Sequence, residues 1–451
     1  MANSQRQPTH QNTGNDSGWF PKWQPYDGHL DHHPVRIHEY LPADKSLLLG
    51  LQHAFAMFGA TVLAPLLMGF DANLAILMAG LSTVLFFFLT GGRVPSYLGS
   101  SFAFIAPVIT ATAYTGSGFN GNLSVALGGI FVCGIFYAMV GLLVMKTGVG
   151  WIEKLMPPVV TGAIVMIIGL NLAPVTIKGV SGNQFDSWVA LMTVLSISAV
   201  AVFSRGMLRR LLLLIGLVLA YIAYFVLTNV LGYGKPIDFT PVAQAAWVGL
   251  PNFYHPTFDI NAIILIAPVA FILIAENLGH IKAVEAMTGQ AVSPYMGRAF
   301  FADGLCTAMS SSMGGTGVTT YAENIGVMAV TKVYSTTVFV VAGLIAVLLG
   351  LSPKFGAIIH TIPAPLLGGA SIVVFGLITV AGVKIWLDNH IDFSKNANLI
   401  IAAVTVIMGA GDFSLHIGKF NLGGIGTATV VAIVLNLLFS RSEKAKLTVL
   451  K

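Results

Sequence analysis

Long apolar runs separated by short polar linkers cover the chain from residue 46 to residue 440. Most runs approach the roughly 20 apolar residues that a transmembrane helix needs, but the runs at 102–113 and 323–331 are shorter. The pattern predicts an all-α polytopic membrane protein with fourteen transmembrane segments. The expected segments are 46–68, 73–90, 102–113, 123–146, 157–176, 187–204, 210–232, 260–281, 298–314, 323–331, 333–352, 363–384, 396–411 and 421–440.

Two sequence patterns occur once in each half of the chain. Pro-x-x-x-Gly-Ala begins at Pro158 and again at Pro365, in the fifth and twelfth segments. The run S-S-F-A at 100–103 corresponds to T-T-Y-A at 319–322, directly before the two short segments. Both pairs fit a duplication of seven segments. Because seven is odd, the second half must enter the membrane from the opposite side, which predicts a 7+7 inverted repeat.

The two short segments have the features of half-helices. Residues 97–102 and 318–322, which precede them, are rich in the β-branched, aromatic and hydroxyl types that favour extended structure. We expect two short antiparallel β-strands here, one before the half-helix of segment 3 and one before that of segment 10. A helix that starts inside the membrane directs free N–H groups and partial positive charge into a cavity. Such interrupted segments in an inverted repeat are typical of secondary transporters with a site at the membrane midplane.

Composition agrees with a membrane protein. The chain has 451 residues, of which 55% are hydrophobic and 9% charged, against about 25% charged in soluble domains. The net charge of +5 does not indicate nucleic-acid binding, because lysine and arginine mainly set topology in such proteins. The loops predicted to be cytoplasmic hold Arg93, Lys146, Lys154, Arg205, Arg209, Arg210, Lys282, Arg298, Lys332, Lys384 and Lys395. The opposite loops hold Lys178, Lys235, Lys354 and Lys419.

Polar sequence at both ends is expected to lie in the cytoplasm. Residues 1–45 form a predicted N-terminal tail without the apolar core of a secretory signal, and residues 441–451 form a C-terminal tail. The N-terminal tail contains His29, His32, His33 and His38. This cluster could bind a metal, but a solvated, partly disordered tail is the preferred interpretation, and no metal or other cofactor is expected.

Only three of the eighteen acidic residues fall inside predicted segments, namely Glu276, Asp303 and Glu323. Carboxylates within a membrane are costly and usually functional. His280 lies four residues after Glu276, on the same helix face, so the two could relay a proton or form a structural hydrogen bond. Glu323 immediately precedes the second half-helix, where a substrate role is favoured over simple capping. Asp303 is expected to be structural, and His53 could either line the site or pack.

Motifs for other classes of protein are absent from the sequence. There is no phosphate-binding G-x-x-x-x-G-K-[ST], no H-E-x-x-H and no G-x-S-x-G. Cys133 and Cys306 both lie in apolar runs and are expected to be inert. An enzyme is therefore not predicted.

Four motifs resemble those of the nucleobase–ascorbate transporter family, also called nucleobase:cation symporters. E-N-I-G-V-M-A-V-T-K at 323–332 is similar to the family signature [QEP]-N-x-G-x-x-x-x-T-[RKG]. The likeness extends through L-Q-H-A-F-A-M-F-G at 51–59, L-G-S-S-F-A-F at 98–104 and A-E-N-L-G-H at 275–280. It covers about 46–440 and is greatest to bacterial uracil and pyrimidine permeases.

The resemblance implies a division into a core domain, which binds substrate, and a gate domain. The core would comprise 46–150 and 260–352, and the gate 151–259 and 353–440. Relatives tend to form homodimers through their gate domains. The resemblance also implies a multi-pass protein of the bacterial cytoplasmic (inner) membrane.

For the site, the resemblance implies that Glu276 and Glu323 bind the base. The backbone N–H groups of Phe102 and Ala322 would also contact it, and His280 would support Glu276 and take part in proton coupling. Ala322 replaces a glycine found in a relative, which could narrow the pocket.

The chemistry of uracil matches this arrangement. Its ring N–H groups suit carboxylate acceptors, and its carbonyl groups suit the N–H donors of half-helices. Phe102 or Tyr321 could stack on the ring, while His53, Asn324 and Ser101 are expected to support the site. Since an unpaired buried carboxylate is costly, one glutamate should carry a proton for part of the cycle, which favours proton symport by alternating access.

Three alternatives remain at this point. The cargo could be a purine such as xanthine or uric acid. Families with the same inverted repeat also carry anions, but two carboxylates facing one site argue against an anion. A membrane-embedded enzyme or structural protein has no motif in its favour.

Overall fold

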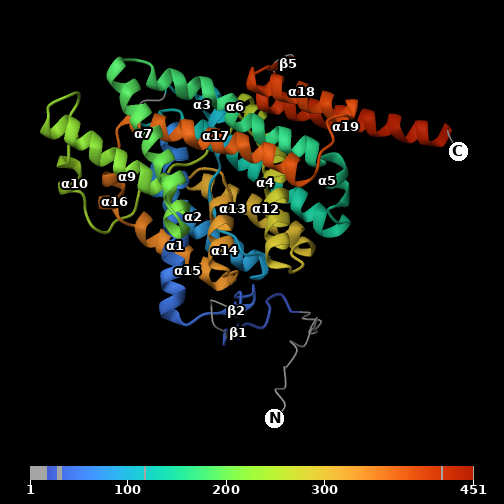
Figure 1. Ribbon diagram of the computed structural model, residues 1–451, viewed down its shortest axis with the longest axis horizontal. Helices are drawn as coiled ribbons and strands as arrows, with labels where there is room; N and C mark the ends of the chain where they lie inside the picture. The colour runs from blue at the N-terminus through green and yellow to red at the C-terminus, as the bar shows by residue number, and fades with distance from the viewer. Residues whose placement is uncertain (1–17, 28–32, 116–117, 418–419, 450–451) are drawn as a thin grey trace, which may run out of the picture.

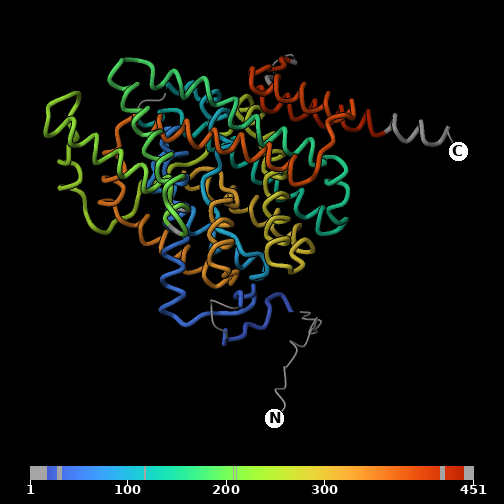
Figure 2. The backbone as a smooth tube through the Cα atoms, viewed as in Figure 1, coloured from blue at the N-terminus to red at the C-terminus, as the bar shows by residue number. Residues whose placement is uncertain are grey.

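The structure of the chain, a computed structural model, describes residues 18–27, 33–115, 118–417 and 420–449. It is predominantly helical, with short strands among the helices (Figures 1 and 2). The elements of the first half are β1 Gln24–Pro25, β2 Glu39–Tyr40, α1 Ala43–Met68, α2 Ala72–Thr90, β3 Leu98–Ser100, η1 Phe102–Phe104, α3 Ile105–Thr112, α4 Leu123–Thr147, α5 Gly150–Leu155, α6 Pro158–Val180, α7 Gln184–Phe203, α8 Gly206–Arg210, α9 Leu212–Phe225, η2 Val226–Val230 and α10 Thr240–Gln244. Those of the second half are α11 Ile260–Ile266, α12 Val269–Thr288, η3 Ser293–Tyr295, α13 Met296–Ser312, β4 Val318–Thr320, α14 Ala322–Thr331, α15 Thr336–Gly350, α16 Pro353–His360, α17 Ala364–Asp388, α18 Asn396–Ala410, β5 Leu415–Ile417, β6 Phe420–Leu422 and α19 Gly424–Val449.

Several of these helices are long and apolar enough to cross a membrane. Among the described residues there are 8 by length and composition, or up to 9 if α15 and α16, bent by 80°, count as one span. Shorter apolar helices cover Phe102–Thr112, Asn396–Ala410 and Gly424–Ser440. A multi-pass membrane protein is therefore supported, while the count of fourteen and the inverted repeat stay predictions.

The predicted crossing of two extended pieces is present. Strands β3 and β4 pair antiparallel, with Leu98 opposite Thr320 and Ser100 opposite Val318. The backbone pairing continues beyond the strands, since Ser101 N–H donates to the Gly317 carbonyl at 2.9 Å. All six strand residues are buried. The two segments thus satisfy each other's backbone groups in an interior where water cannot.

Helices around this crossing pack through small residues. α13 lies against α4, where a Cβ on Gly134 would come within 2.6 Å of the Ala308 backbone nitrogen. In the same way α6 lies against α17, where a Cβ on Gly382 would lie 2.5 Å from the Gly162 carbonyl oxygen. Small residues at helix crossings allow this close backbone approach.

Helices α7 and α9 lie towards one side of the molecule, together with α10 (Figure 1). They pack on each other, and large apolar side chains such as Val218, Leu219 and Ile222 on α9 are exposed. An apolar surface of this kind suits contact with lipid or with a second subunit. The expected core and gate boundaries and the homodimer stay predictions.

Part of the described N-terminal segment packs against the helices, whereas composition predicted a solvated tail. Val35 is fully buried and forms a β-bridge with Val333, next to the end of α14. The indole of Trp19 donates to the Phe88 carbonyl at 2.9 Å, and α1 already begins at Ala43. Apolar residues such as Val35, Ile37 and Leu41 supply the buried surface that the overall polar composition concealed. Of the histidine cluster, His29 and His32 lie outside the described residues.

Candidate functional site

The half-helices begin where the crossed strands end. α14 starts at Ala322, directly after β4, and its N-cap residue Tyr321 makes no side-chain capping bond. Ala322 is exposed, so its backbone N–H is accessible to a ligand, whereas the N–H of Glu323 bonds its own carboxylate. On the other strand, Phe102 opens η1 and is partly buried, and the hydroxyl of Ser101 caps that turn by accepting from Ala103 N–H at 3.3 Å.

Two carboxylates from different helices lie near this crossing. Glu323 lies in the first turn of α14, and Glu276 lies in α12, which contacts η1, β4 and α14. Both side chains are partly buried, and they are close enough for their charges to interact. The structure thus brings together the two glutamates that the sequence singled out, beside the start of a half-helix.

His280 also reaches the crossing, but its hydrogen bond goes to a strand. Its Nδ1 lies 2.8 Å from the hydroxyl oxygen of Thr320 in β4. Thr320 in turn donates to Oδ1 of Asn277 at 3.3 Å, and Asn277 donates to Asp303 at 3.0 Å. Asp303 therefore belongs to a buried polar network behind the site, consistent with a structural role. Thr320 lay within the repeated T-T-Y-A pattern, but nothing in that pattern identified its partner.

The aromatic side chains near the crossing divide into two groups. The hydroxyl of Tyr321 donates to the Ser100 carbonyl at 2.8 Å, and its ring fills the space over Gly99, where a Cβ would lie 2.6 Å away. Phe102 instead meets Phe375 of α17 edge-on, with ring centroids 6.1 Å apart and planes at 87°. Phe102 can therefore line the site, whereas Tyr321 stabilises the pairing of the two strands. Phe375 was not predicted, since its position beside the site depends on helix packing.

His53 and Asn324 form a buried pair between α1 and α14. The Asn324 amide donates to Nδ1 of His53 at 3.0 Å and to its backbone carbonyl at 3.2 Å. Both side chains are fully buried, and the imidazole lies 4.5 Å from the ring of Phe339. This geometry favours the packing interpretation of His53 over a lining role, because the ring is enclosed by protein.

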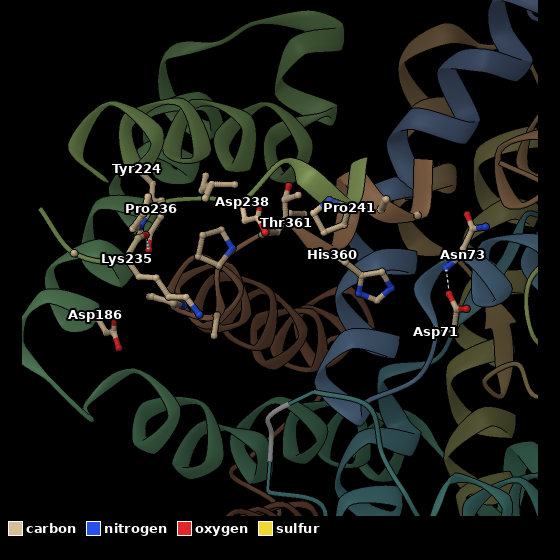
Figure 3. Close-up of a pocket in the computed structure, with 18 of the residues that line it drawn as sticks. Asp71, Asn73, Asp186, Tyr224, Lys235, Pro236, Asp238, Pro241, His360 and Thr361 are labelled. Atoms are coloured by element: carbon tan, nitrogen blue, oxygen red, sulfur yellow. Dashed lines mark hydrogen bonds between the residues drawn. The ribbon is translucent and has the colours of Figure 1, made fainter. Parts of the chain in front are cut away.

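A large cavity lies elsewhere in the molecule (Figure 3). It has a volume of about 1130 Å³ and lies among α7, α9, α16, the start of α17 and the start of α2. Charged residues line it from several directions, including Asp71, Asp186, Lys235 and Asp238. Glu276 and Glu323 do not line it. We place the site at the strand crossing nevertheless, because the two partly buried carboxylates and the accessible N–H of Ala322 occur there.

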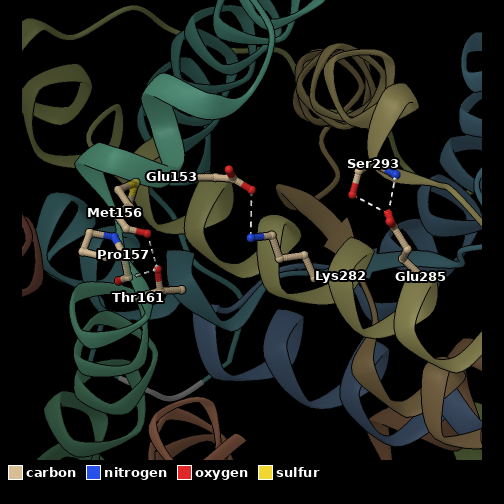
Figure 4. Close-up of polar contacts among 7 residues, drawn as sticks. All are labelled: Glu153, Met156, Pro157, Thr161, Lys282, Glu285 and Ser293. Carbon is tan, nitrogen blue, oxygen red and sulfur yellow. Dashed lines mark hydrogen bonds and ion pairs between the residues drawn. The ribbon is translucent and has the colours of Figure 1, made fainter. Parts of the chain in front are cut away.

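An ion pair links α12 to the short helix α5 (Figure 4). Lys282 Nζ lies 2.8 Å from Glu153 Oε1, and the two side chains are 51% and 40% exposed. Nearby on α12, Glu285 accepts from the backbone N–H of Ser293 at 2.7 Å and so fixes the turn that follows. Lys282 lies two residues after His280, so this pair connects the site-bearing helix to the segment leading into α6.

Comparisons with known sequences identify relatives over nearly the whole chain. The profile of the Permease family (Xan_ur_permease) matches residues 44–418. The chain is 64% identical over 422 residues to the Escherichia coli (strain K12) protein named "Putative pyrimidine permease RutG", covering 94% of this chain and 96% of that protein. It is 38% identical over 421 residues to the "Uracil permease" of Paenibacillus larvae, covering 91% and 98%.

Solved structures with the same fold are membrane transporters. The transmembrane domain of the cyanobacterial bicarbonate transporter BicA matches with TM-score 0.61 and 18% identity, over 87% of this chain and 96% of that domain. The murine anion transporter Slc26a9 matches with TM-score 0.65 and 12% identity, over 89% and 69%. At these identities the structures support the fold alone, whereas the sequence matches extend through all four motifs. The chain belongs to the Permease family, as its resemblance to the nucleobase–ascorbate transporters indicated.

Proposed function

We propose that the chain is a proton-coupled symporter that imports uracil or a related pyrimidine base across the cytoplasmic membrane by alternating access. The observation that carries this proposal is the placement of Glu276 near Glu323, at the start of α14. Two acceptors and a set of backbone donors match the alternating N–H and carbonyl groups of a uracil edge. The names of the relatives, a pyrimidine permease and a uracil permease, support the same substrate class.

Proton coupling follows from the electrostatics of this arrangement. Two carboxylates that face one enclosed space repel each other when both are ionised. A proton bound to one of them lowers the charge of the loaded site, which makes closure around a neutral base less costly. Loading the proton and the base together is therefore the favoured cycle.

The edge contact between Phe102 and Phe375 supports alternating access. Phe102 lies at the strand crossing, whereas Phe375 belongs to α17, in the expected gate domain. Aromatic pairs of this kind are weak enough to separate and re-form. Movement of one domain past the other would open and close the site at this contact.

The two carboxylates also argue against an anion as the substrate. BicA and Slc26a9 share the fold, but an anion site requires positive charge without facing carboxylates. A purine base is the second candidate, because it too offers N–H and carbonyl groups on one edge. Because a purine has two fused rings and a pyrimidine only one, the size of the binding pocket would decide between them.

The test is uptake of labelled uracil into liposomes that contain the purified chain, with and without an inward proton gradient. Glu276→Gln and Glu323→Gln should each abolish or severely reduce gradient-driven uptake while the protein still inserts. Asp44→Asn, a change at an exposed acid in the first turn of α1, is the matched control. Competition by unlabelled pyrimidines but not by xanthine or uric acid would support the pyrimidine assignment. Normal uptake by the Glu323→Gln variant would exclude its binding role.

A further inference from the structure

We infer that Thr320 is a positioning residue that holds His280 in the tautomer protonated at Nδ1, leaving Nε2 as the proton-accepting atom. The inference rests on the proposed function, since it concerns the same site. Thr320 contacts neither carboxylate in the described hydrogen bonds. It would act through the imidazole alone.

The direction of the hydrogen bonds around Thr320 follows from what each atom can do. A threonine hydroxyl has one proton to donate and can also accept. Its oxygen lies 3.3 Å from Asn277 Oδ1, and an amide oxygen can only accept. The hydroxyl proton therefore points to Asn277. The contact of 2.8 Å with His280 Nδ1 must then be donated by the imidazole.

The orientation of the Asn277 amide is fixed by its other partners. Its Nδ2 lies 3.0 Å from Asp303 Oδ2 and 3.0 Å from the Tyr137 hydroxyl. The Tyr137 hydroxyl donates onward to the Leu273 carbonyl at 3.4 Å, so it accepts from the amide. If the amide were flipped, Oδ1 of Asn277 would face the carboxylate oxygen of Asp303, and two acceptors would meet without a proton between them. The orientation assigned to Asn277 thus pairs its Nδ2 with two oxygen acceptors and its Oδ1 with the Thr320 hydroxyl.

Burial makes this directional chain hard to reverse. Thr320 is 2% exposed, and Asn277, Asp303 and Tyr137 are fully buried. Where no water can replace a lost partner, a reversed bond leaves two donors or two acceptors facing each other. Asp303 therefore determines, through three successive hydrogen bonds, that Nδ1 of His280 is the donor to Thr320.

The consequence for His280 concerns its second nitrogen. Nδ1 contacts the Thr320 hydroxyl, and the backbone of the same residue also bonds the imidazole. The side chain is partly buried rather than enclosed. With Nδ1–H committed to Thr320, neutral His280 presents an unprotonated Nε2. That atom can take a proton and release it without breaking the contact with β4.

Other charged and titratable groups lie on α12 and on the elements packed against it. The elements concerned are α12 itself, the helices and turns packed against it, and α5, which is joined to it by an ion pair. The groups are Glu276, Lys282 and Glu285 on α12, Cys133, Tyr137 and Lys146 on α4, Glu153 and Lys154 on α5, Lys178 on α6, Tyr295 on η3, Arg298, Asp303 and Cys306 on α13, and Tyr321 and Glu323 at the start of α14.

The direct test is the nitrogen NMR spectrum of the full chain, labelled with ¹⁵N-histidine and embedded in lipid nanodiscs. The His280 signals are assigned by their loss in His280→Gln. At a pH where the imidazole is neutral, we expect a protonated Nδ1 and an unprotonated Nε2. In Thr320→Val the population should move towards the opposite tautomer. A wild-type His280 protonated at Nε2 would overturn the inference whether or not the chain transports uracil.

The second measurement is transport. Thr320→Val keeps the shape of the side chain and removes the hydroxyl, and we expect gradient-driven Vmax to fall about tenfold with a smaller change in KM. Thr320→Ser should restore Vmax and the wild-type pH profile. Thr193→Val is the control, because that buried hydroxyl donates only to the Val189 carbonyl of its own helix. A Thr320→Val variant that matches this control would count against the inference. A chain that transports no base at all would instead refute the proposed function.

Discussion

Gly134 of α4 and Gly304 of α13 approach so closely that a Cβ on Gly304 would lie 2.6 Å from the Gly134 carbonyl oxygen. The same Cβ would lie 2.3 Å from the backbone nitrogen of Ala138. Backbone atoms cannot move aside as a flexible side chain can. The contact therefore fixes the distance between α4 and α13, the helices that carry Tyr137 and Asp303.

Gly304→Ala should destabilise the protein because α13 must move away from α4. Overpacking of this kind costs about 1–3 kcal/mol. The measurement is thermal unfolding in detergent, followed by tryptophan fluorescence. Gly179→Ala on α6 is the control, since a Cβ there meets nothing within 4 Å. Equal unfolding temperatures for the two variants would show that the helices can separate freely.

Asn324→Ala should lower stability more than it weakens binding, although Asn324 belongs to the sequence signature. Its amide bonds both Nδ1 and the carbonyl of His53, and loss of a partner at a buried polar group costs about 1–3 kcal/mol. Thermal unfolding and the KM for uracil should be measured together. Asn261→Ala, at an exposed position of α11, controls for the substitution. A large rise in KM at unchanged stability would instead assign Asn324 to the base.

Tyr321→Phe should leave the KM for uracil within about threefold of wild type, because the hydroxyl is committed to the Ser100 carbonyl. The lost hydrogen bond should cost about 1 kcal/mol of stability. Tyr221→Phe, which removes a hydroxyl bonded to Thr361 away from the crossing, is the matched control. A tenfold rise in KM for Tyr321→Phe would mean that the hydroxyl contacts the base.

The Glu153–Lys282 ion pair should contribute little to stability, because both side chains are about half exposed. Exposed pairs are typically worth about 0.2–1 kcal/mol. A double-mutant cycle with Glu153→Lys, Lys282→Glu and the swapped pair measures the coupling. The swapped pair should recover most of the lost stability, and the coupling should fall as salt is added. A coupling that persists at high salt would indicate further partners.

Local pattern was sufficient to predict the strand crossing. The residues at 97–102 and 318–322 had extended propensity and occupied matching places in two halves, and the pairing of Gly99 with Thr319 agrees with that expectation. Glu276 and Glu323 could be found because carboxylates are rare in apolar segments. Each of these signals is contained in a few neighbouring residues.

Partners from distant segments could not be predicted. Thr320 and His280 are separated by 40 positions, and their contact depends on the angle at which α12 passes β4. The contact of Phe375 with Phe102 likewise depends on where α17 packs. The buried N-terminal residues were concealed for a different reason, since a few apolar side chains in a polar stretch hardly change its average composition.

Pairing between β3 and β4 has a consequence for biosynthesis. The partner of Ser100 is Val318, so at 5–20 residues per second the first strand waits roughly ten to forty seconds for its partner to be made. During that interval its backbone groups need temporary partners, from water, the insertion machinery or neighbouring helices. The nascent chain is therefore most vulnerable to misfolding before residue 318 is made, and a ribosome that stalls earlier leaves a product without a binding site.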